Sequence, residues 1–291
     1  MIRKNKPKIA FFGTSRSSTV VLEKLKKAGL TPNLVVTSPD KPKGRNLIVT
    51  SPPVGIWAEK NIVNFVQPEE FDKSFLDFLR EENFDLFVTA SYGKILPKEI
   101  LDIPKYGMLN VHPSLLPKLR GASPIISAIL GDEKKTGVTI MLVDEKVDHG
   151  SILAQASIEL ESWSASASWP PKASELEEIL FTEGGKLLAE VIPKWIAGKI
   201  KPEVQDESQA TFTKKIKKED GLIELDGDPY QNLLKIRAFD EWPGVYFLVN
   251  RNGKKIRVKI TDAEIEDNKL KIKKVIPEGK KEMDYEDYLR G

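Results

Sequence analysis

Residues 8–29 read KIAFFGTSRSSTVVLEKLKKAG, which is a short apolar run followed by a polar turn and an amphipathic segment. The apolar run predicts a first strand at Ile9–Phe12, and the amphipathic segment predicts a helix at Thr19–Lys27 that ends at Gly29. The turn between them, Gly13–Ser18, has one glycine and matches neither the Gly-x-Gly-x-x-Gly nor the Walker pattern for phosphate binding. We interpret it as a structural turn with a helix cap.

The same alternation of strand and helix continues through the first half of the chain. We expect further strands at Leu34–Thr37, Leu86–Ala90, Met108–Val111 and Val138–Leu142. We expect further helices at Val54–Lys60, Ser74–Glu82 and Pro124–Leu130. This alternation predicts an α/β fold with a doubly wound, mostly parallel sheet that helices cover on both faces. In such sheets, ligands bind beyond the carboxyl ends of the strands.

The pattern changes after Gly150. A strand is expected at Ile152–Ile158 and a long helix at Leu176–Ile196, with an exposed loop at Ser162–Pro171 between them. The polar, aperiodic stretch around Pro202 predicts a linker. We therefore expect a first domain at residues 1–197, a linker at 198–212 and a second domain at 213–291.

Short strands separated by turn signals are expected in the second domain. They are Leu222–Leu225, Val245–Val249, Lys255–Ile265 and Leu270–Ile276. One helix, Pro229–Ala238, interrupts them, and Asn250–Gly253 is a plausible hairpin turn. This pattern indicates a small, mainly β, barrel-like domain.

The composition is that of a globular protein, with 291 residues of which 40% are apolar and 30% charged. No apolar run is long enough to span a bilayer or to form the core of a secretion signal. The chain has no cysteine and two histidines, which excludes disulfides and disfavours a zinc enzyme. The net charge is +2, so a nucleic acid would have to meet local basic clusters, which on their own are typical of solvated surface.

Asn110 and His112 are the candidate catalytic pair, because residues i and i+2 of a strand point to the same face. Pro113 follows at once and ends the strand at the carboxyl edge of the sheet. An imidazole that can move a proton, beside an amide that can donate to a developing negative oxygen, suits acyl-group transfer. A lone histidine is more often structural, but the neighbouring amide and the acidic turn at residues 143–150 favour a catalytic role.

Two carboxylates of that turn, Asp144 and Asp148, are placed to orient His112 and to raise its pKa. The spacing does not decide between them. A serine-nucleophile hydrolase is not indicated, because the sequence has no Gly-x-Ser-x-Gly elbow.

Residues 110–124, NVHPSLLPKLRGASP, together with residues 147–150, VDHG, resemble the signature of the folate-dependent formyltransferases. Residues 89–97, TASYGKILP, resemble the strand and loop of that family's folate pocket. The resemblance covers the whole first domain and implies a Rossmann-like catalytic domain joined to an OB-like β-barrel. Two departures are the turn at residues 15–18, which is usually more apolar, and His149, which replaces a small polar residue.

The resemblance also implies how the site works. Asn110 would stabilise an oxyanion, His112 would move a proton from the attacking amine to the departing folate nitrogen, and Asp148 would hold His112 in place. The formyl donor would be 10-formyltetrahydrofolate. The residues implied to contact this folate are Ser114, Leu115, Leu116, Pro117, Tyr92, Gly93 and Asp144.

The second domain indicates the branch of the family. Residues 215–221, 236–239, 242–244 and 277–281, with the early loop at residues 38–45, resemble the branch that acts on the methionyl initiator tRNA. This branch implies a monomeric enzyme. A cytoplasmic location is the default for a chain with no cysteine and no secretion signal, and neither a metal nor a membrane partner is expected. The residues implied to contact the tRNA are Arg45, Lys43, Lys215 and Lys217.

Three alternatives remain. A formyltransferase acting on an amino sugar nucleotide would share the catalytic residues, and residues 205–211 occur in that branch as well. A plain RNA-binding protein would use the second domain and leave the first as an inert scaffold. A purine-pathway formyltransferase is disfavoured, because it resembles the first domain alone.

Overall fold

The computed structural model describes residues 6–43, 47–160, 170–251 and 253–290. The chain divides into two compact units. Unit 1 contains Met1–Arg120, Gly137–Ser157 and Glu178–Thr211, and unit 2 contains Gly121–Thr136, Ile158–Glu177 and Phe212–Gly291. Because the chain passes between the units more than once, the expected domain limits at residues 197 and 212 stay a prediction.

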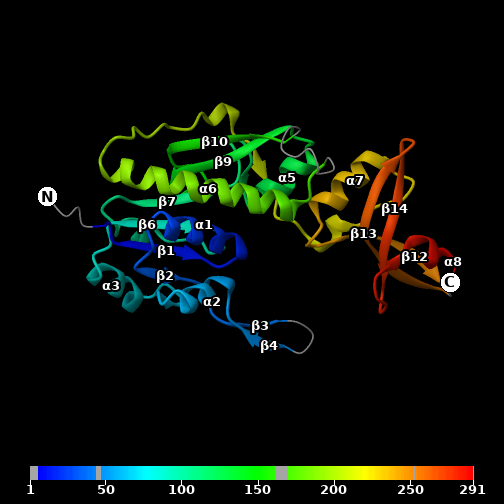
Figure 1. The fold of residues 1–291 in the computed structure, drawn as a ribbon, viewed down its shortest axis with the longest axis horizontal. Coiled ribbons are helices and arrows are strands. Elements are labelled where there is room, and N and C mark those ends of the chain that lie inside the picture. The colour runs from blue at the N-terminus through cyan, green and yellow to red at the C-terminus, as the bar shows by residue number, and fades with distance from the viewer. Residues whose placement is uncertain (1–5, 44–46, 161–169, 252, 291) are drawn as a thin grey trace. The chain divides into compact units, whose positions relative to one another are not determined.

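Unit 1 is built on a seven-stranded sheet in the order β10–β9–β7–β6–β1–β2–β5 (Figure 1). The strands are β1 (Ile9–Gly13), β2 (Leu34–Val36), β5 (Asn64–Val66), β6 (Leu86–Ala90), β7 (Met108–His112), β9 (Lys135–Leu142) and β10 (Ile152–Glu159). The neighbours from β5 to β7 are parallel, and β9 is antiparallel to β7. The predicted α/β class with a mostly parallel sheet is confirmed. The sequence does not predict β5, since three residues are too few to show a period.

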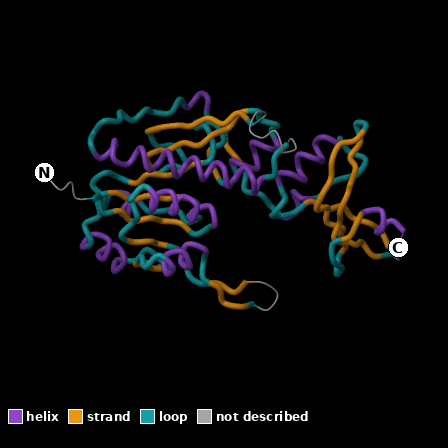
Figure 2. Tube along the Cα trace, in the orientation of Figure 1, coloured by secondary structure: helices purple, strands orange, loops and turns teal. Residues whose placement is uncertain are grey.

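Helices cover both faces of this sheet (Figure 2). They are α1 (Arg16–Lys27), α2 (Pro53–Lys60), α3 (Lys73–Glu81), α4 (Lys98–Leu101) and α6 (Ala173–Ile196). A Cβ added at Gly184 of α6 would lie 2.5 Å from Val111, so this helix packs directly on β7. On the other face, Leu79 of α3 and Ile100 of α4 lie in one core cluster with Met108. The sheet is therefore doubly wound, as the alternation predicts.

The turn between β1 and α1 is a structural cap, and this prediction is confirmed. The hydroxyl of Ser15 accepts a hydrogen bond from the backbone N–H of Ser18 at 3.3 Å. The buried hydroxyl of Ser18 donates to the carbonyl of Ala90 at 2.6 Å. A Cβ at Gly13 would lie 2.6 Å from the ring of Phe11, so the turn has no room for a side chain there.

Unit 2 holds a small antiparallel sheet in the order β12–β13–β14–β15. Its strands and helices are β12 (Val245–Arg251), β13 (Lys254–Glu266), β14 (Lys269–Pro277), β15 (Met283–Asp284), α5 (Pro124–Leu130), α7 (Pro229–Ala238) and α8 (Tyr285–Arg290). The mainly β character of this part is confirmed. The strand expected at Leu222–Leu225 is wrong, because Leu222 makes only an isolated bridge to Tyr246.

Several short elements complete the described chain. They are β3 (Lys41–Lys43), β4 (Ile48–Thr50), β8 (Arg120–Gly121), β11 (Phe212–Thr213) and the 3₁₀ turns Glu207–Gln209 and Lys218–Gly221. The hairpin of β3 and β4 is not predicted by the sequence analysis. The expected loop at Ser162–Pro171 and the expected turn at Asn250–Gly253 lie partly outside the described residues.

Candidate active site

The candidate catalytic residues lie at the carboxyl end of β7, inside the sheet of unit 1. Asn110 pairs with Thr89 of β6 on one side and with Met141 of β9 on the other, and His112 pairs with Thr139 of β9. Asn110 is half-buried, whereas His112 is only 4% exposed. The pair thus lies on a strand with neighbours on both sides, at the carboxyl end of the parallel strands. This is where α/β proteins bind ligands.

Asp148 is the carboxylate that meets both of these side chains. Its Oδ1 lies 3.5 Å from Nδ1 of His112 and 3.5 Å from Nδ2 of Asn110. Its backbone is left-handed, with a φ of 50°, a conformation that is uncommon for residues other than glycine. The structure therefore brings the three predicted catalytic residues together around one oxygen atom.

Asp144, the other carboxylate that the sequence leaves open, pairs with His149 instead. Its Oδ2 lies 2.6 Å from Nδ1 of His149, and its Oδ1 accepts from the backbone N–H of Lys146 at 2.9 Å. Nε2 of His149 lies 3.6 Å from Glu207. The second histidine is therefore engaged by carboxylates other than the one that His112 faces, and the folate contact expected of Asp144 stays a prediction.

Burial lowers the pKa of His112 below its usual value of 6.5, because the low-dielectric interior disfavours the charged imidazolium. The carboxylate of Asp148 and the hydrogen bond with the carbonyl of Leu119 raise this pKa, but by less than burial lowers it. The carboxylate thus raises the pKa of His112 as expected, but the net shift is downward, because a sequence does not show how deeply His112 is buried.

One tautomer of the neutral His112 fits its contact with Leu119 and leaves a base for the reaction. Nε2 lies 3.2 Å from the carbonyl oxygen of Leu119, which can only accept a hydrogen bond. In the tautomer that carries its proton on Nε2, this carbonyl is satisfied and the lone pair of Nδ1 faces the side where Asn110 and Asp148 meet. That nitrogen can accept a proton from a reacting group, and the nearby carboxylate of Asp148 then stabilises the resulting cation.

Side chains of β9 and β10 hold the loop that follows His112 through hydrogen bonds. The buried hydroxyl of Thr139 donates to the carbonyl of Ser114 at 2.7 Å and accepts from the backbone N–H of Leu116 at 3.2 Å. Gln155 donates to the carbonyl of Leu116 at 2.8 Å. The hydroxyl of Ser114 donates to the carbonyl of Lys118 at 2.7 Å, so Ser114 shapes the loop through its side chain. Leu115 and Pro117 are half-exposed, whereas Leu116 is 3% exposed.

Tyr92 and Gly93 lie in the loop after β6. The ring of Tyr92 is buried against Phe12 and Phe71, and burial raises the pKa of its hydroxyl to about 12. Within the described part of the chain, that hydroxyl has no hydrogen-bond partner. Gly93 has a φ of 78° and no atom within 4 Å of where a Cβ would lie, so its backbone is open to a ligand. The predicted folate contacts remain predictions.

Two residues of the site escape the sequence analysis. Gln205 is 5% exposed, and its Nε2 donates to the carbonyls of Asp148 at 2.9 Å and Gly150 at 2.8 Å. Arg120 is 1% exposed and donates to Oε1 of Gln205. Gln205 falls in the expected linker, yet this residue belongs to unit 1. Both residues fall in stretches that carry the family resemblance, residues 110–124 and 205–211, but the sequence does not show that they contact each other or Asp148.

The residues expected to contact tRNA are only partly described. Arg45 lies outside the described residues, and Lys43 ends β3, with its side chain outside the description as well. Lys215 and Lys217 are exposed in unit 2, where the backbone N–H of Lys217 donates to the carboxylate of Asp220 at 2.6 Å. These four residues are not brought together within a single unit.

Among the described residues, no three or more His, Asp and Glu side chains are grouped so that they could hold a metal ion. In the same part of the chain, no helix has both the length and the apolar character that crossing a membrane requires.

Comparison with known families places both parts of the chain. Residues 7–183 match the formyl transferase family, and residues 215–270 match the formyl transferase C-terminal domain. The methionyl-tRNA formyltransferase of Bacillus licheniformis is 38% identical over 98% of this chain and 95% of its own length. That of Chloroflexus aurantiacus is 42% identical over 82% of this chain and 75% of its own length.

Solved structures share the fold at lower identity. The methionyl-tRNA formyltransferase from Clostridium thermocellum aligns with a TM-score of 0.61 and 18% identity, over 93% of this chain and 98% of that chain. An N-formyltransferase from Helicobacter canadensis, in complex with folinic acid and dTDP-3-aminofucose, aligns with a TM-score of 0.63 and 19% identity, over 91% and 95%. At this identity the structures support the fold alone.

Proposed function

The chain belongs to the formyl transferase family, and we propose that it transfers the formyl group of 10-formyltetrahydrofolate to the α-amino group of methionyl initiator tRNA. The observation that carries the proposal is the meeting of Asn110, His112 and Asp148 around one carboxylate oxygen. The acceptor is supported by relatives named methionyl-tRNA formyltransferase, which the chain matches over nearly its whole length. The product is N-formylmethionyl-tRNA, which serves translation initiation in the cytoplasm.

Asn110 acts on the oxygen of the formyl group. The α-amino nitrogen attacks the formyl carbon, a C–N bond forms, and the carbonyl oxygen gains a negative charge. The amide of Asn110 has two N–H groups, of which one faces Asp148 and the other can be donated to this oxyanion. A free α-amino group has a pKa of about 8, so about a tenth of it is unprotonated and nucleophilic at pH 7.

His112 moves the proton. Its Nδ1 accepts a proton from the attacking nitrogen, and the imidazolium that forms is stabilised by Asp148. The same proton then passes to the folate nitrogen while the bond between that nitrogen and the formyl carbon breaks and the carbonyl re-forms. Burial lowers the pKa of His112, so the imidazole is neutral and ready to accept a proton at neutral pH.

The donor is assigned to the loops that border this pair. Leu115 and Pro117 are half-exposed and offer apolar surface to a pteridine-type ring system, while Gly93 offers open backbone. Ser114 and Leu116 are buried and hold the loop in shape. The remaining contacts in the proposal are Tyr92 and Asp144.

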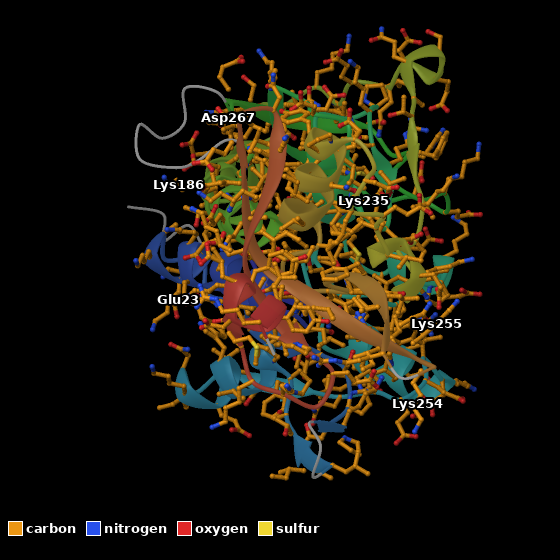
Figure 3. All side chains as sticks on the ribbon, turned by 90° about the vertical axis from the view of Figure 1, so that its right-hand side faces the viewer. Glu23, Lys186, Lys235, Lys254, Lys255 and Asp267 are labelled. Atoms are coloured by element: carbon orange, nitrogen blue, oxygen red, sulfur yellow. The ribbon has the colours of Figure 1, made fainter. Side chains whose placement is uncertain are left out.

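The tRNA is assigned to basic side chains on both units. Arg45 and Lys43 belong to the early loop, and Lys215 and Lys217 are exposed in unit 2. Unit 2 also carries a basic hairpin, whose exposed Lys254 and Lys255 are labelled in Figure 3. Each phosphate that such a cation neutralises adds affinity that salt weakens.

The test of the function is transfer of a labelled formyl group from 10-formyltetrahydrofolate to charged initiator tRNA, with an amino sugar nucleotide present as competing acceptor. The proposal expects the label in the aminoacyl-tRNA. Label in the sugar nucleotide would support the alternative branch, and label in neither, with tRNA still bound, would support a plain RNA-binding protein.

The tRNA contacts have their own test. The changes Arg45→Ala and Lys215→Ala should each weaken use of tRNA and reduce the slope of log affinity against log salt by about 1, and should spare hydrolysis of the donor without tRNA. Lys186→Ala is the matched control, because it removes one positive charge from a lysine of α6, labelled in Figure 3, whose ammonium is paired with Glu183. Equal loss of donor hydrolysis and tRNA use in Arg45→Ala would count against that contact.

A further inference from the structure

We propose that Gln205, oriented by Arg120, is a positioning residue that holds the backbone turn from which Asp148 reaches His112 and Asn110. The inference deepens the proposed function and rests on it, because it assigns a task only if Asp148 serves the reaction. Gln205 lies 57 residues from Asp148 in the chain and touches that residue through its carbonyl.

The turn that carries Asp148 needs support from outside. Asp148 has a left-handed backbone, which persists only where surrounding contacts determine it. Two residues later, a Cβ at Gly150 would lie 1.9 Å from the carbonyl oxygen of Leu142, so the chain passes against β9 with no room for a side chain. The carbonyls of Asp148 and Gly150 both accept hydrogen bonds from Nε2 of Gln205, at 2.9 and 2.8 Å. The amide group of Gln205 therefore holds the backbone of the turn at both Asp148 and Gly150.

Arg120 fixes which way the amide of Gln205 points. Nε and Nη2 of Arg120 donate to Oε1 of Gln205 at 3.0 and 2.8 Å. A guanidinium has only donors and a backbone carbonyl only accepts, so a single orientation of the amide satisfies all four bonds. The other edge of the guanidinium donates to both carboxylate oxygens of Glu207, at 3.0 and 2.7 Å. Neither a carboxylate nor a hydrocarbon at position 205 can satisfy both neighbours.

The same segment holds the second partner of His112. The carbonyl of Leu119 receives Nε2–H of His112, and the N–H of Leu119 donates to the hydroxyl of Thr211 at 2.8 Å. The backbone N–H of Arg120 donates to the carbonyl of Thr211 at 2.9 Å. Both ring nitrogens of His112 thus face groups that are placed by the stretch from Gln205 to Thr211.

Gln205→Met tests the proposal, because methionine fills a similar volume but can donate no hydrogen bond. If the turn loosens, Asp148 is misplaced, and displacement by about 1 Å of a group in a reaction geometry can cost about a hundredfold in rate. We expect kcat to fall by about 10- to 100-fold with the KM values for the donor and the charged tRNA within about threefold of wild type. Gln205→Glu should do the same, since its carboxylate keeps Arg120 but repels the two carbonyls. Gln209→Met is the control, because Gln209 is an exposed glutamine in the same segment.

Two further readouts separate positioning from a merely structural role. In an Asp148→Asn background, Gln205→Met should add less than about threefold, because the two changes remove one function. The pKa of His112, read by NMR titration, should fall in Gln205→Met, in the direction of Asp148→Asn, because the charge of Asp148 moves away from His112 in the first variant and is removed in the second.

Unchanged kcat in both Gln205 variants, or effects that multiply with Asp148→Asn, would overturn the inference. Should Gln205→Met fail to fold by circular dichroism, Gln205→Glu carries the same comparison. If Asp148→Asn is as active as wild type, the proposed role of Asp148 itself is refuted. If Asp148→Asn is impaired while the Gln205 variants are as active as wild type, only the inference about Gln205 is refuted.

Discussion

Thr139→Val is a sharp test of how the loop after His112 is held. Valine has nearly the shape of threonine, so the change removes a hydroxyl without removing volume. That hydroxyl is fully buried, donates to the carbonyl of Ser114 at 2.7 Å and accepts from the N–H of Leu116 at 3.2 Å. It also accepts from Gln155 at 2.9 Å. The variant therefore leaves two buried backbone groups without their partner.

The expected cost follows from those two groups. A buried polar group that loses its partner costs about 1–3 kcal/mol, so two of them lower the free energy of unfolding by about 2–6 kcal/mol. Thr139→Ser is the matched control, because it keeps the hydroxyl and loses one methyl group, at a cost of about 1 kcal/mol. Because the affected loop borders the proposed folate site, the KM for the formyl donor should rise in Thr139→Val and stay near wild type in Thr139→Ser.

The measurement is urea unfolding followed by circular dichroism, read as a shift of the midpoint at unchanged slope. Amide hydrogen exchange at Leu116 adds a local readout, since its N–H loses its acceptor and should exchange faster in Thr139→Val alone. Equal midpoints for the valine and serine variants, with Leu116 equally protected in both, would refute the account of this loop.

Three further predictions concern the site and its turns. The pKa of His112, read from its imidazole signals by NMR titration, should lie below 6.5, because burial lowers it, and Asp148→Asn should move it lower still; a pKa above 6.5 would contradict this. Gly150→Ala should lower the melting temperature far more than Gly93→Ala. A Cβ at Gly150 meets a carbonyl oxygen at 1.9 Å, whereas alanine at position 93 costs only the strain of a left-handed backbone, about 1–2 kcal/mol. Similar melting temperatures for the two variants would count against the tight turn at Gly150. Tyr92→Phe should leave the free energy of unfolding unchanged or raise it by about 1 kcal/mol, because it removes a buried hydroxyl without a partner among the described residues. A loss of stability would contradict this, and a large increase in the KM for the donor would show that the proposed folate contact of Tyr92 is made by this hydroxyl.

The sequence predicts the periodic parts of this fold well, because burial on one or two faces leaves a pattern in the order of residues. The strand at Leu86–Ala90 and the helices at Pro124–Leu130 and Pro229–Ala238 have the predicted limits. Short elements such as β5 leave too little pattern, and the apolar residues at Leu222–Leu225 resemble a strand although they do not pair as one.

The candidate site is predictable in its residue types and less so in its connections. The i/i+2 spacing of Asn110 and His112 fixes their common face, whichever sheet they join. The choice between Asp144 and Asp148 depends on a left-handed turn, and the pKa of His112 depends on burial, neither of which has a sequence signal. The link from Arg120 to Gln205 spans 85 residues and depends on tertiary packing alone.

The central claim is that His112 moves a proton in formyl transfer, and a single-turnover experiment with His112→Gln tests it most directly. Glutamine can still donate to the carbonyl of Leu119 but cannot act as a base near neutral pH. With donor and charged initiator tRNA both saturating, the account predicts a transfer rate about 100- to 10,000-fold below wild type, with tRNA binding unchanged. A rate within about threefold of wild type would contradict it.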